Sequence, residues 1–206
     1  MIHRRALIGG LMSAPALVRA ASGETGAPKE FRIGFQKSGV LVMARQQGTI
    51  EAALASLGVG SVRWVEFQYG PPLLEALGLG SIDIGAVGDT PPVFAQVAGA
   101  KVVYAAATPA SQSAILVPDG SGLRTVADLK GRRLAFARGS SSHNFVVQAL
   151  AKAGLKPTDV QQAFLSPADA VAAFSRGSVD AWAVWDPYFA LAEMKHGARV
   201  LTTTEI

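Results

Sequence analysis

The chain has 206 residues, of which 50% are hydrophobic and 17% charged, and it contains no cysteine. Such a composition excludes an intrinsically disordered protein. The absence of cysteine excludes a disulfide scaffold, a thiolate metal site and a cysteine nucleophile. The formal charge of +4 would favour nucleic acid or an anionic membrane as partner only if it lay on the folded body. The length suits one large domain or two smaller lobes.

Residues 1–21 are predicted to be a cleaved signal peptide. Arg4 and Arg5 precede an apolar run over residues 6–17, and Val18-Arg19-Ala20 provides an A-x-A-like exit. The run is too short to anchor the chain across a bilayer, and a short buried helix is the alternative. The arginine pair leaves open whether export uses the general or the twin-arginine route. Cleavage removes three arginines and leaves 16 basic against 15 acidic residues, a net charge of +1.

Residues 22–29 form a predicted flexible lead-in, and an α/β pattern follows it. Strands are expected at residues 32–35, 62–67, 82–87 and 101–106, with helices between them at 40–57, 71–79 and 91–98. The first helix should be interrupted at Gly48, and Pro71-Pro72 should open the second. The alternation of short strands and helices predicts a first lobe over residues 30–108.

The second half of the chain repeats the first at a distance of roughly 100 residues. Three pairs of segments match in the same order: residues 32–35 with 133–136, 80–91 with 177–187, and 99–103 with 197–201. The repeat predicts a second lobe over residues 109–201, joined to the first near residues 108–111. In open α/β sheets ligands lie at the carboxyl ends of the strands. Four loops should therefore line one cleft: residues 36–39, 88–91, 138–143 and 185–187.

The loop Gly139-Ser140-Ser141-Ser142-His143 carries the clearest chemical signal. It follows a predicted strand and opens an amphipathic helix that should end at Gly154. Helix N-termini present unpaired N–H groups and a positive dipole end, and three hydroxyls add donors, so the loop favours an oxyanion ligand. One serine would suffice as an ordinary N-cap, which is the alternative. His143 could donate a hydrogen bond to the anion or remain a capping or solvated residue.

Other cleft residues have weaker signals. Asp89 and Asp186 occupy equivalent repeat positions before proline, where capping of the next helix is the favoured interpretation. The second interpretation is that these two carboxylates shape the cleft or bridge the closed lobes. Gln36 fits hydrogen bonding to an oxyanion, and Trp185 could cover an apolar ligand tail. Lys37 is interpreted as a solvated lysine rather than an anion contact.

No cofactor or metal site is predicted, because neither C-x-x-C nor H-E-x-x-H occurs. A G-x-S-x-G elbow and a basic run interleaved with aromatic residues are also missing, which argues against a serine hydrolase and against nucleic acid as a partner.

These motifs together resemble the periplasmic aliphatic sulfonate-binding proteins of ABC importers, within the group that includes taurine- and nitrate-binding proteins. The resemblance extends over nearly all of residues 31–201. It rests most on the serine-rich loop and on Trp185-Asp186-Pro187, together with Gly80-Ser81-Ile82-Asp83, Gly88-Asp89-Thr90-Pro91-Pro92 and Thr125-Val126-Ala127-Asp128-Leu129-Lys130-Gly131.

The resemblance implies an α/β, two-lobed type II periplasmic binding protein fold that clamps its ligand between the lobes. It implies capture of an alkanesulfonate in the periplasm without catalysis, and delivery to an ABC permease in the inner membrane for sulfur uptake; a monomer is expected. The family's anion contacts would fall on Gln36 and on Ser140, Ser141, Ser142 and His143. Asp89, Thr90, Trp185 and Asp186 lie in other matching cleft segments.

Family members continue beyond the point where this chain ends, so residues 202–206 would begin a return to the first lobe that is then missing. We expect such a shortened chain to bind weakly or to be unstable. The alternatives are a binder of taurine, nitrate, a pyrimidine precursor or another small anion, a small-molecule enzyme on the same fold, or a sensor lobe. The tail length of the ligand is left open.

Overall fold

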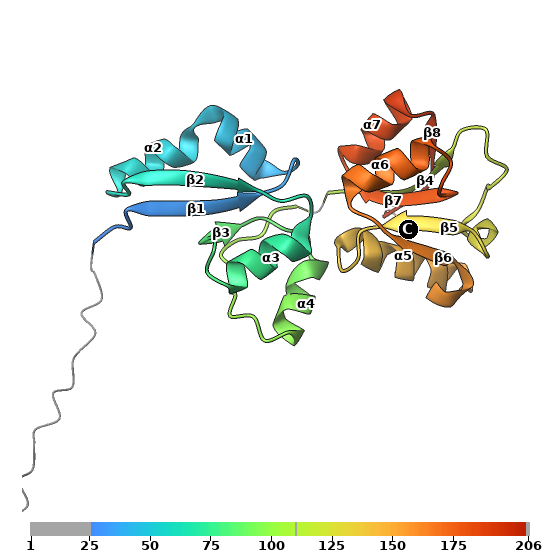
Figure 1. Cartoon of the computed structure of the whole chain (residues 1–206), viewed down its shortest axis with the longest axis horizontal. Coiled ribbons are helices and arrows are strands. Elements are labelled where there is room, and N and C mark those ends of the chain that lie inside the picture. Colours follow the sequence, from blue (N-terminus) through green and yellow to red (C-terminus); the bar gives the residue numbers. More distant parts are fainter. Residues whose placement is uncertain (1–25, 110, 205–206) are drawn as a thin grey trace, which may run out of the picture.

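A computed structural model describes residues 26–109 and 111–204 (Figure 1). The predicted signal peptide lies outside the described residues. The two halves form separate α/β lobes, with one sheet in each, joined by an extended segment. Within the described part of the chain, no helix is both long and apolar enough to cross a bilayer.

Lobe 1 is built on a three-stranded sheet of order β2-β1-β3 in which the strands run parallel. Its strands are β1 (Glu30–Phe35), β2 (Ser61–Glu66) and β3 (Ile84–Gly85), and its helices are α1 (Val40–Gln47), α2 (Thr49–Ser56), α3 (Gly70–Gly78) and α4 (Thr90–Val97). Gly48 adopts a left-handed φ of 64° between α1 and α2, so the predicted interruption is confirmed.

Lobe 2 contains a five-stranded sheet of order β6-β5-β7-β4-β8, with β4 antiparallel to both of its neighbours. Its strands are β4 (Ser113–Pro118), β5 (Arg133–Phe136), β6 (Gln161–Phe164), β7 (Ala181–Trp185) and β8 (Ala198–Thr203). Its helices are α5 (Ser141–Lys152), α6 (Pro167–Ser175) and α7 (Tyr188–Lys195), with short turns η1 (Val126–Leu129) and η2 (Pro157–Asp159).

The core of lobe 2 lies on both faces of this sheet. Helices α6 and α7 cover one face around Trp182, which is 1% exposed, and α5 covers the other around Phe136 and Leu150. Strands β4 and β7 are buried on both faces, which is why they read as continuous apolar runs. Burial of each large side chain contributes about 1.5–3 kcal/mol, and this holds the carboxyl ends of β5 and β7 in place.

The internal repeat is visible as a duplicated ion pair. In lobe 1, Arg32 at the start of β1 binds Asp83 through its backbone N, Nε and Nη2 at 2.7, 3.0 and 2.6 Å. In lobe 2, Arg133 at the start of β5 binds Asp180 through the same three atoms at 2.8, 3.1 and 2.7 Å. The two lobes therefore tie β1 and β5 to the aspartate that precedes the next parallel strand, β3 or β7, in the same way.

One predicted strand is wrong. Residues 101–106 form no strand, and Val103 and Tyr104 are 90% and 77% exposed. The matching segment of lobe 2 forms β8 because β4 lies between it and β7. No counterpart of β4 occurs among the described residues of lobe 1, so residues 101–106 have no neighbouring strand to pair with. Strand β3 is likewise shorter than the predicted 82–87.

Candidate functional site

The lobes meet where the loops after β3 and β5 face each other. A Cβ added to Gly88 of lobe 1 would lie 2.1 Å from the hydroxyl oxygen of Ser141 in lobe 2. One added to Gly139 would lie 3.4 Å from Cγ of Pro71 at the start of α3. Helices α4 and α5 also contact each other across this boundary. Two of the four loops predicted to line the cleft are thus in direct contact.

The three serines of the loop have different roles. Ser140 is 2% exposed and Ser142 is fully buried. The Ser140 hydroxyl lies 2.7 Å from the Ala137 carbonyl and 2.8 Å from the Ser142 hydroxyl, and Ser140 is the N-cap of α5. The expected capping role is thus filled by Ser140, and Ser142 supports it from inside. The hydroxyl that faces the opposite lobe belongs to Ser141.

The first turn of α5 is a donor surface. Gly139 holds a left-handed φ of 72°, which turns the chain sharply from β5 into the helix. The N–H groups of Ser141 and Ser142, at the first two helical positions, have no partner within the helix. They lie at the positive end of the helix dipole, which stabilises an anion by about 0.3–1 kcal/mol. Together with the Ser141 hydroxyl they suit an oxyanion.

His143 is held in one tautomer. Its Nδ1 accepts a hydrogen bond from the Gly139 N–H at 3.1 Å, so the ring proton of the neutral side chain is on Nε2. The ring stacks on Phe136 at 5.0 Å and meets Phe164 edge-on at 6.0 Å. Burial and the nearby Arg138 guanidinium lower the pKa of His143, which favours the neutral form. His143 therefore braces the loop and presents one N–H donor.

Asp89 lies on the lobe 1 side of the contact between Gly88 and Ser141. Burial alone would raise the pKa of its carboxyl group, but hydrogen bonds from the Ser141 and Thr90 hydroxyls outweigh burial, and the pKa lies below its ordinary value. The Thr90 Oγ1 is 3.0 Å from Asp89 Oδ1. Asp89 therefore carries a negative charge at neutral pH and bridges the two lobes through Ser141.

The favoured prediction that Asp89 and Asp186 cap the following helices is wrong. Asp89 precedes α4 with φ −64° and ψ −38°, a helical conformation rather than the extended one that capping requires. The residue before α7 is Pro187, and α7 also receives no side-chain capping bond. Asp186 instead joins β7 to the inter-lobe segment, where its N–H donates to the Gln112 carbonyl at 3.1 Å.

The loop after β1 is already engaged within lobe 1. Gln36 Nε2 donates to the Ala86 carbonyl at 3.0 Å, which ties this loop to the end of β3. Lys37 Nζ lies 3.4 Å from Glu66 Oε1 in an exposed ion pair, so the side chain is solvent-exposed as expected and is also paired with a carboxylate. One amide hydrogen and the oxygen of Gln36 stay available for a ligand.

Sequence reasoning missed two tyrosines that join the lobes. Tyr188 meets Trp185 edge-on at 6.0 Å. Burial raises the pKa of the Tyr188 hydroxyl, and the charges of Lys37 and Glu66 from lobe 1 also act on it. Tyr69, just before α3, packs against the lobe 2 core cluster that contains Trp185. The sequence signal that could have found them is their position shortly after a strand, where cleft residues are expected, since Tyr69 follows β2 and Tyr188 follows β7.

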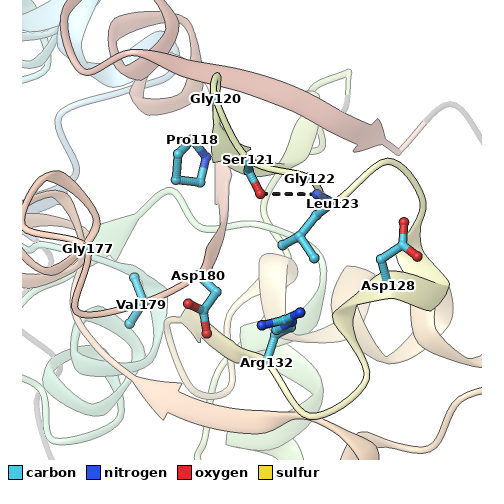
Figure 2. A pocket seen from close by; sticks show the side chains of 10 residues that line it. All are labelled: Pro118, Gly120, Ser121, Gly122, Leu123, Asp128, Arg132, Gly177, Val179 and Asp180. Carbon is cyan, nitrogen blue, oxygen red and sulfur yellow. Dashed lines mark hydrogen bonds between the residues drawn. The ribbon is translucent and has the colours of Figure 1, made fainter.

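Another hollow, of about 590 Å³, lies at the other end of the lobe 2 strands, beside Pro118 at the end of β4. Figure 2 shows the residues that line it. Its charged groups are satisfied within the lobe. Asp180 pairs with Arg133, Asp128 accepts from the N–H groups of Arg124 and Thr125, and Arg132 lies between the two carboxylates (Figure 2). The hollow is therefore not the candidate site.

No group of three or more His, Cys, Asp or Glu side chains that could hold a metal ion occurs in residues 26–109 and 111–204.

Two α/β lobes, a donor surface at the start of α5 and the aromatic side chains of Tyr69, Trp185 and Tyr188 between the lobes define the class of two-lobed solute-binding proteins. The family model for "ABC transporter, phosphonate, periplasmic substrate-binding protein" matches residues 62–206. The chain belongs to this family.

Several relatives are named for sulfonates. The chain is 48% identical over 197 residues to the putative aliphatic sulfonates-binding protein of Escherichia coli K12, covering 94% of this chain and 60% of the relative. It is 42% identical to the putative aliphatic sulfonates-binding protein of Bacillus subtilis, covering 90% of this chain and 56% of that relative. The chain thus spans little more than half the length of these relatives.

A solved structure supports both the family match and the similarity to sulfonate-binding proteins. The alkanesulfonate-binding protein of Xanthomonas axonopodis pv. citri, bound to MOPS, superposes with a TM-score of 0.81 at 48% identity. The match covers 87% of this chain and 62% of that one. The predicted two-lobed periplasmic binding protein fold, and the resemblance to sulfonate-binding proteins, are confirmed.

Proposed function

We propose that the protein is the periplasmic binding component of an ABC importer and that it captures aliphatic sulfonates for sulfur uptake. Identities of 48% and 42% to proteins named for aliphatic sulfonates support this ligand class. Export through residues 1–21 and delivery of the ligand to a permease in the inner membrane are parts of the same proposal.

The observation that carries the proposal is the donor surface at the start of α5. A sulfonate is a monoanion with three acceptor oxygens and no proton to donate. The N–H groups of Ser141 and Ser142 are donors only, at a positive helix end, and the Ser141 hydroxyl can donate its proton to an anion in place of Asp89. Ser140 and Ser142 hold the turn from behind, and the Nε2–H of His143 is the remaining donor of this loop.

The ligand tail would lie against the aromatic side of the site. Trp185 and Tyr188 of lobe 2, together with Tyr69 of lobe 1, provide apolar surface with polar edges. Gln36 and Thr90 border this region from lobe 1, and Asp186 lies at the inter-lobe segment. Closure of the lobes on the ligand then creates the form that the permease recognises.

The chain would act as a monomer and leave its ligand unchanged. Both faces of the proposed site come from one polypeptide, so a second copy is not required. Light scattering should give the mass of a single chain. Prolonged incubation with a sulfonate should return the ligand intact, whereas turnover would favour an enzyme.

Calorimetric titration with alkanesulfonates, taurine, nitrate and sulfate tests the ligand class. Binding should be tightest for an alkanesulfonate. Ser141→Ala should weaken it by about tenfold or more, since hydrogen bonds to charged groups contribute about 1.5–3 kcal/mol. Ser56→Ala is the matched control, because Ser56 ends α2 and bonds only to the Ala53 carbonyl. A folded chain that gives no heat with any sulfonate would refute the proposal.

A small phosphonate is the second candidate. The matching family model is described by phosphonate, and a tetrahedral phosphonate offers the same three oxygens as a sulfonate. The two ligand classes differ in charge, because a phosphonate carries a second negative charge above about neutral pH.

A further inference from the structure

The proposed anion site contains a negative charge of its own. Asp89 directly follows Gly88, which lies against the Ser141 hydroxyl on which the ligand would dock. Its carboxylate accepts a hydrogen bond from Thr90 Oγ1 at 3.0 Å, and the Ser141 hydroxyl also lowers its pKa. Within the described ranges of the chain, none of the ion pairs involves Asp89. Its charge is therefore stabilised by neutral donors, which are the hydroxyls of Ser141 and Thr90 and the backbone N–H groups of Thr90 and Asp89, and is not cancelled by a cation.

Any anion at the start of α5 must share the Ser141 hydroxyl region with this carboxylate. The repulsion between two charges grows in proportion to the charge of the ligand and is only partly screened near a protein surface. A monoanion gains the donors of α5 against one unit of repulsion. A dianion is attracted more strongly by the same donors but also meets twice that repulsion, so the carboxylate costs a dianion about twice the free energy that it costs a monoanion. This difference is the selectivity that the carboxylate adds.

The carboxylate also has little acceptor capacity left for a ligand. Its two oxygens offer about four lone-pair positions, and the hydroxyls of Ser141 and Thr90 and the backbone N–H groups of Thr90 and Asp89 all act on them. A ligand at this site therefore meets the charge of Asp89 rather than a free acceptor.

We propose that Asp89 is a specificity-determining residue that selects oxyanions by charge, admitting monoanions and disfavouring dianions. The inference rests on the proposed function, since it concerns the same site, and it specifies the ligand class as sulfonates and other singly charged oxyanions. It also explains how a member of a family described by phosphonate can prefer a sulfonate without a new donor set.

The test compares three ligands of similar size at pH 8.5: ethanesulfonate, the monomethyl ester of ethylphosphonate, and ethylphosphonate, which is a dianion there. Wild-type protein should bind the two monoanions more tightly than the dianion. Asp89→Asn keeps the size and one acceptor for Ser141 but removes the charge. It should reduce the ratio of sulfonate affinity to dianion affinity by about tenfold. This is the effect of one unit charge roughly 5 Å away in a partly aqueous medium.

Asp119→Asn is the matched control. It removes one surface carboxylate just after β4, at the end of the strands opposite to the start of α5, and should leave the ratio of affinities unchanged. The wild-type order of the three ligands needs no variant, so it stands even if Asp89→Asn folds poorly.

The outcomes separate the two proposals. Sulfonate binding with an unchanged ratio in Asp89→Asn, or wild-type protein that binds the dianion as tightly as the monoester, overturns the selector role and leaves sulfonate binding intact. Absence of binding by every ligand to the folded wild-type chain overturns both.

Discussion

Replacing Gly88 with alanine tests whether the lobes close through the Gly88–Ser141 contact. The new Cβ would lie 2.1 Å from the Ser141 hydroxyl oxygen and 3.2 Å from its Cβ. Gly88 is not among the glycines with positive φ, so alanine introduces no backbone strain. The effect of the substitution is therefore confined to the space between the two lobes.

The size of the effect follows from these two distances. Rotation of the Ser141 hydroxyl removes the shorter contact but weakens its present interaction with the Asp89 carboxylate. The remaining 3.2 Å contact between Cβ atoms is relieved only if the lobes separate by a few tenths of an ångström. A cost of about 1–2 kcal/mol is at the lower end for overpacked contacts. It corresponds to a loss of roughly 5–30-fold in sulfonate affinity.

Titration calorimetry on a double-mutant cycle measures this loss. Ser141→Gly removes both atoms that the alanine would meet, so Gly88→Ala should cost almost nothing in that background, and the two substitutions should be strongly non-additive. Gly120→Ala is the control, because a Cβ there meets nothing within 4 Å and its φ is not positive.

Two results would refute the reasoning. Wild-type sulfonate affinity in Gly88→Ala would mean that the bound form does not bring these residues together. An equal loss with and without the Ser141 side chain would mean that Gly88 acts through some other contact.

Three further outcomes are expected. Asp180→Asn should lower the melting temperature at pH 7. The hydrogen bond and charge of Arg133 depress the pKa of Asp180 and so stabilise the fold at pH values above that pKa. The difference from wild type should shrink as the pH falls from 3.8 through the lower pKa of Asp180 in the folded state, and a constant difference would contradict this origin. The pKa of His143, from NMR titration of its ring protons, should lie below 6.5 and rise in Arg138→Gln; a value above 6.5 in wild type would be inconsistent with the buried ring. Ser142→Ala should lower the free energy of unfolding by about 1 kcal/mol and leave sulfonate affinity nearly unchanged, the reverse of Ser141→Ala; loss of affinity without loss of stability would place Ser142 at the ligand.

The fold could be predicted from sequence because its strongest signals are local. Alternation of apolar runs, Gly48 as a helix break and Pro71-Pro72 as a helix start depend on neighbouring residues alone. Residues 101–106 have the same apolar character as β8, yet a strand forms only where a neighbour supplies hydrogen bonds. That requirement is set by the sheet and is absent from the segment itself.

The candidate site was predicted at the level of loops, and less well at the level of side chains. The serine run marks the start of α5, but which hydroxyl faces outward depends on which serine is the N-cap, and a shift of one residue changes the answer. Asp89 reads as a cap because it precedes proline, whereas its helical φ and ψ prevent capping. Its contact with Ser141 joins residues of different lobes, and no local pattern encodes such a contact.

The equivalent ion pairs Arg32–Asp83 and Arg133–Asp180 bear on the evolutionary origin of the two lobes. Two lobes that lock the same strand ends with the same three atoms are what duplication and fusion of one ancestral unit would leave behind. In such an origin the two faces of the cleft would have started alike, and the difference between Ser141 on one side and Asp89 on the other would have arisen later.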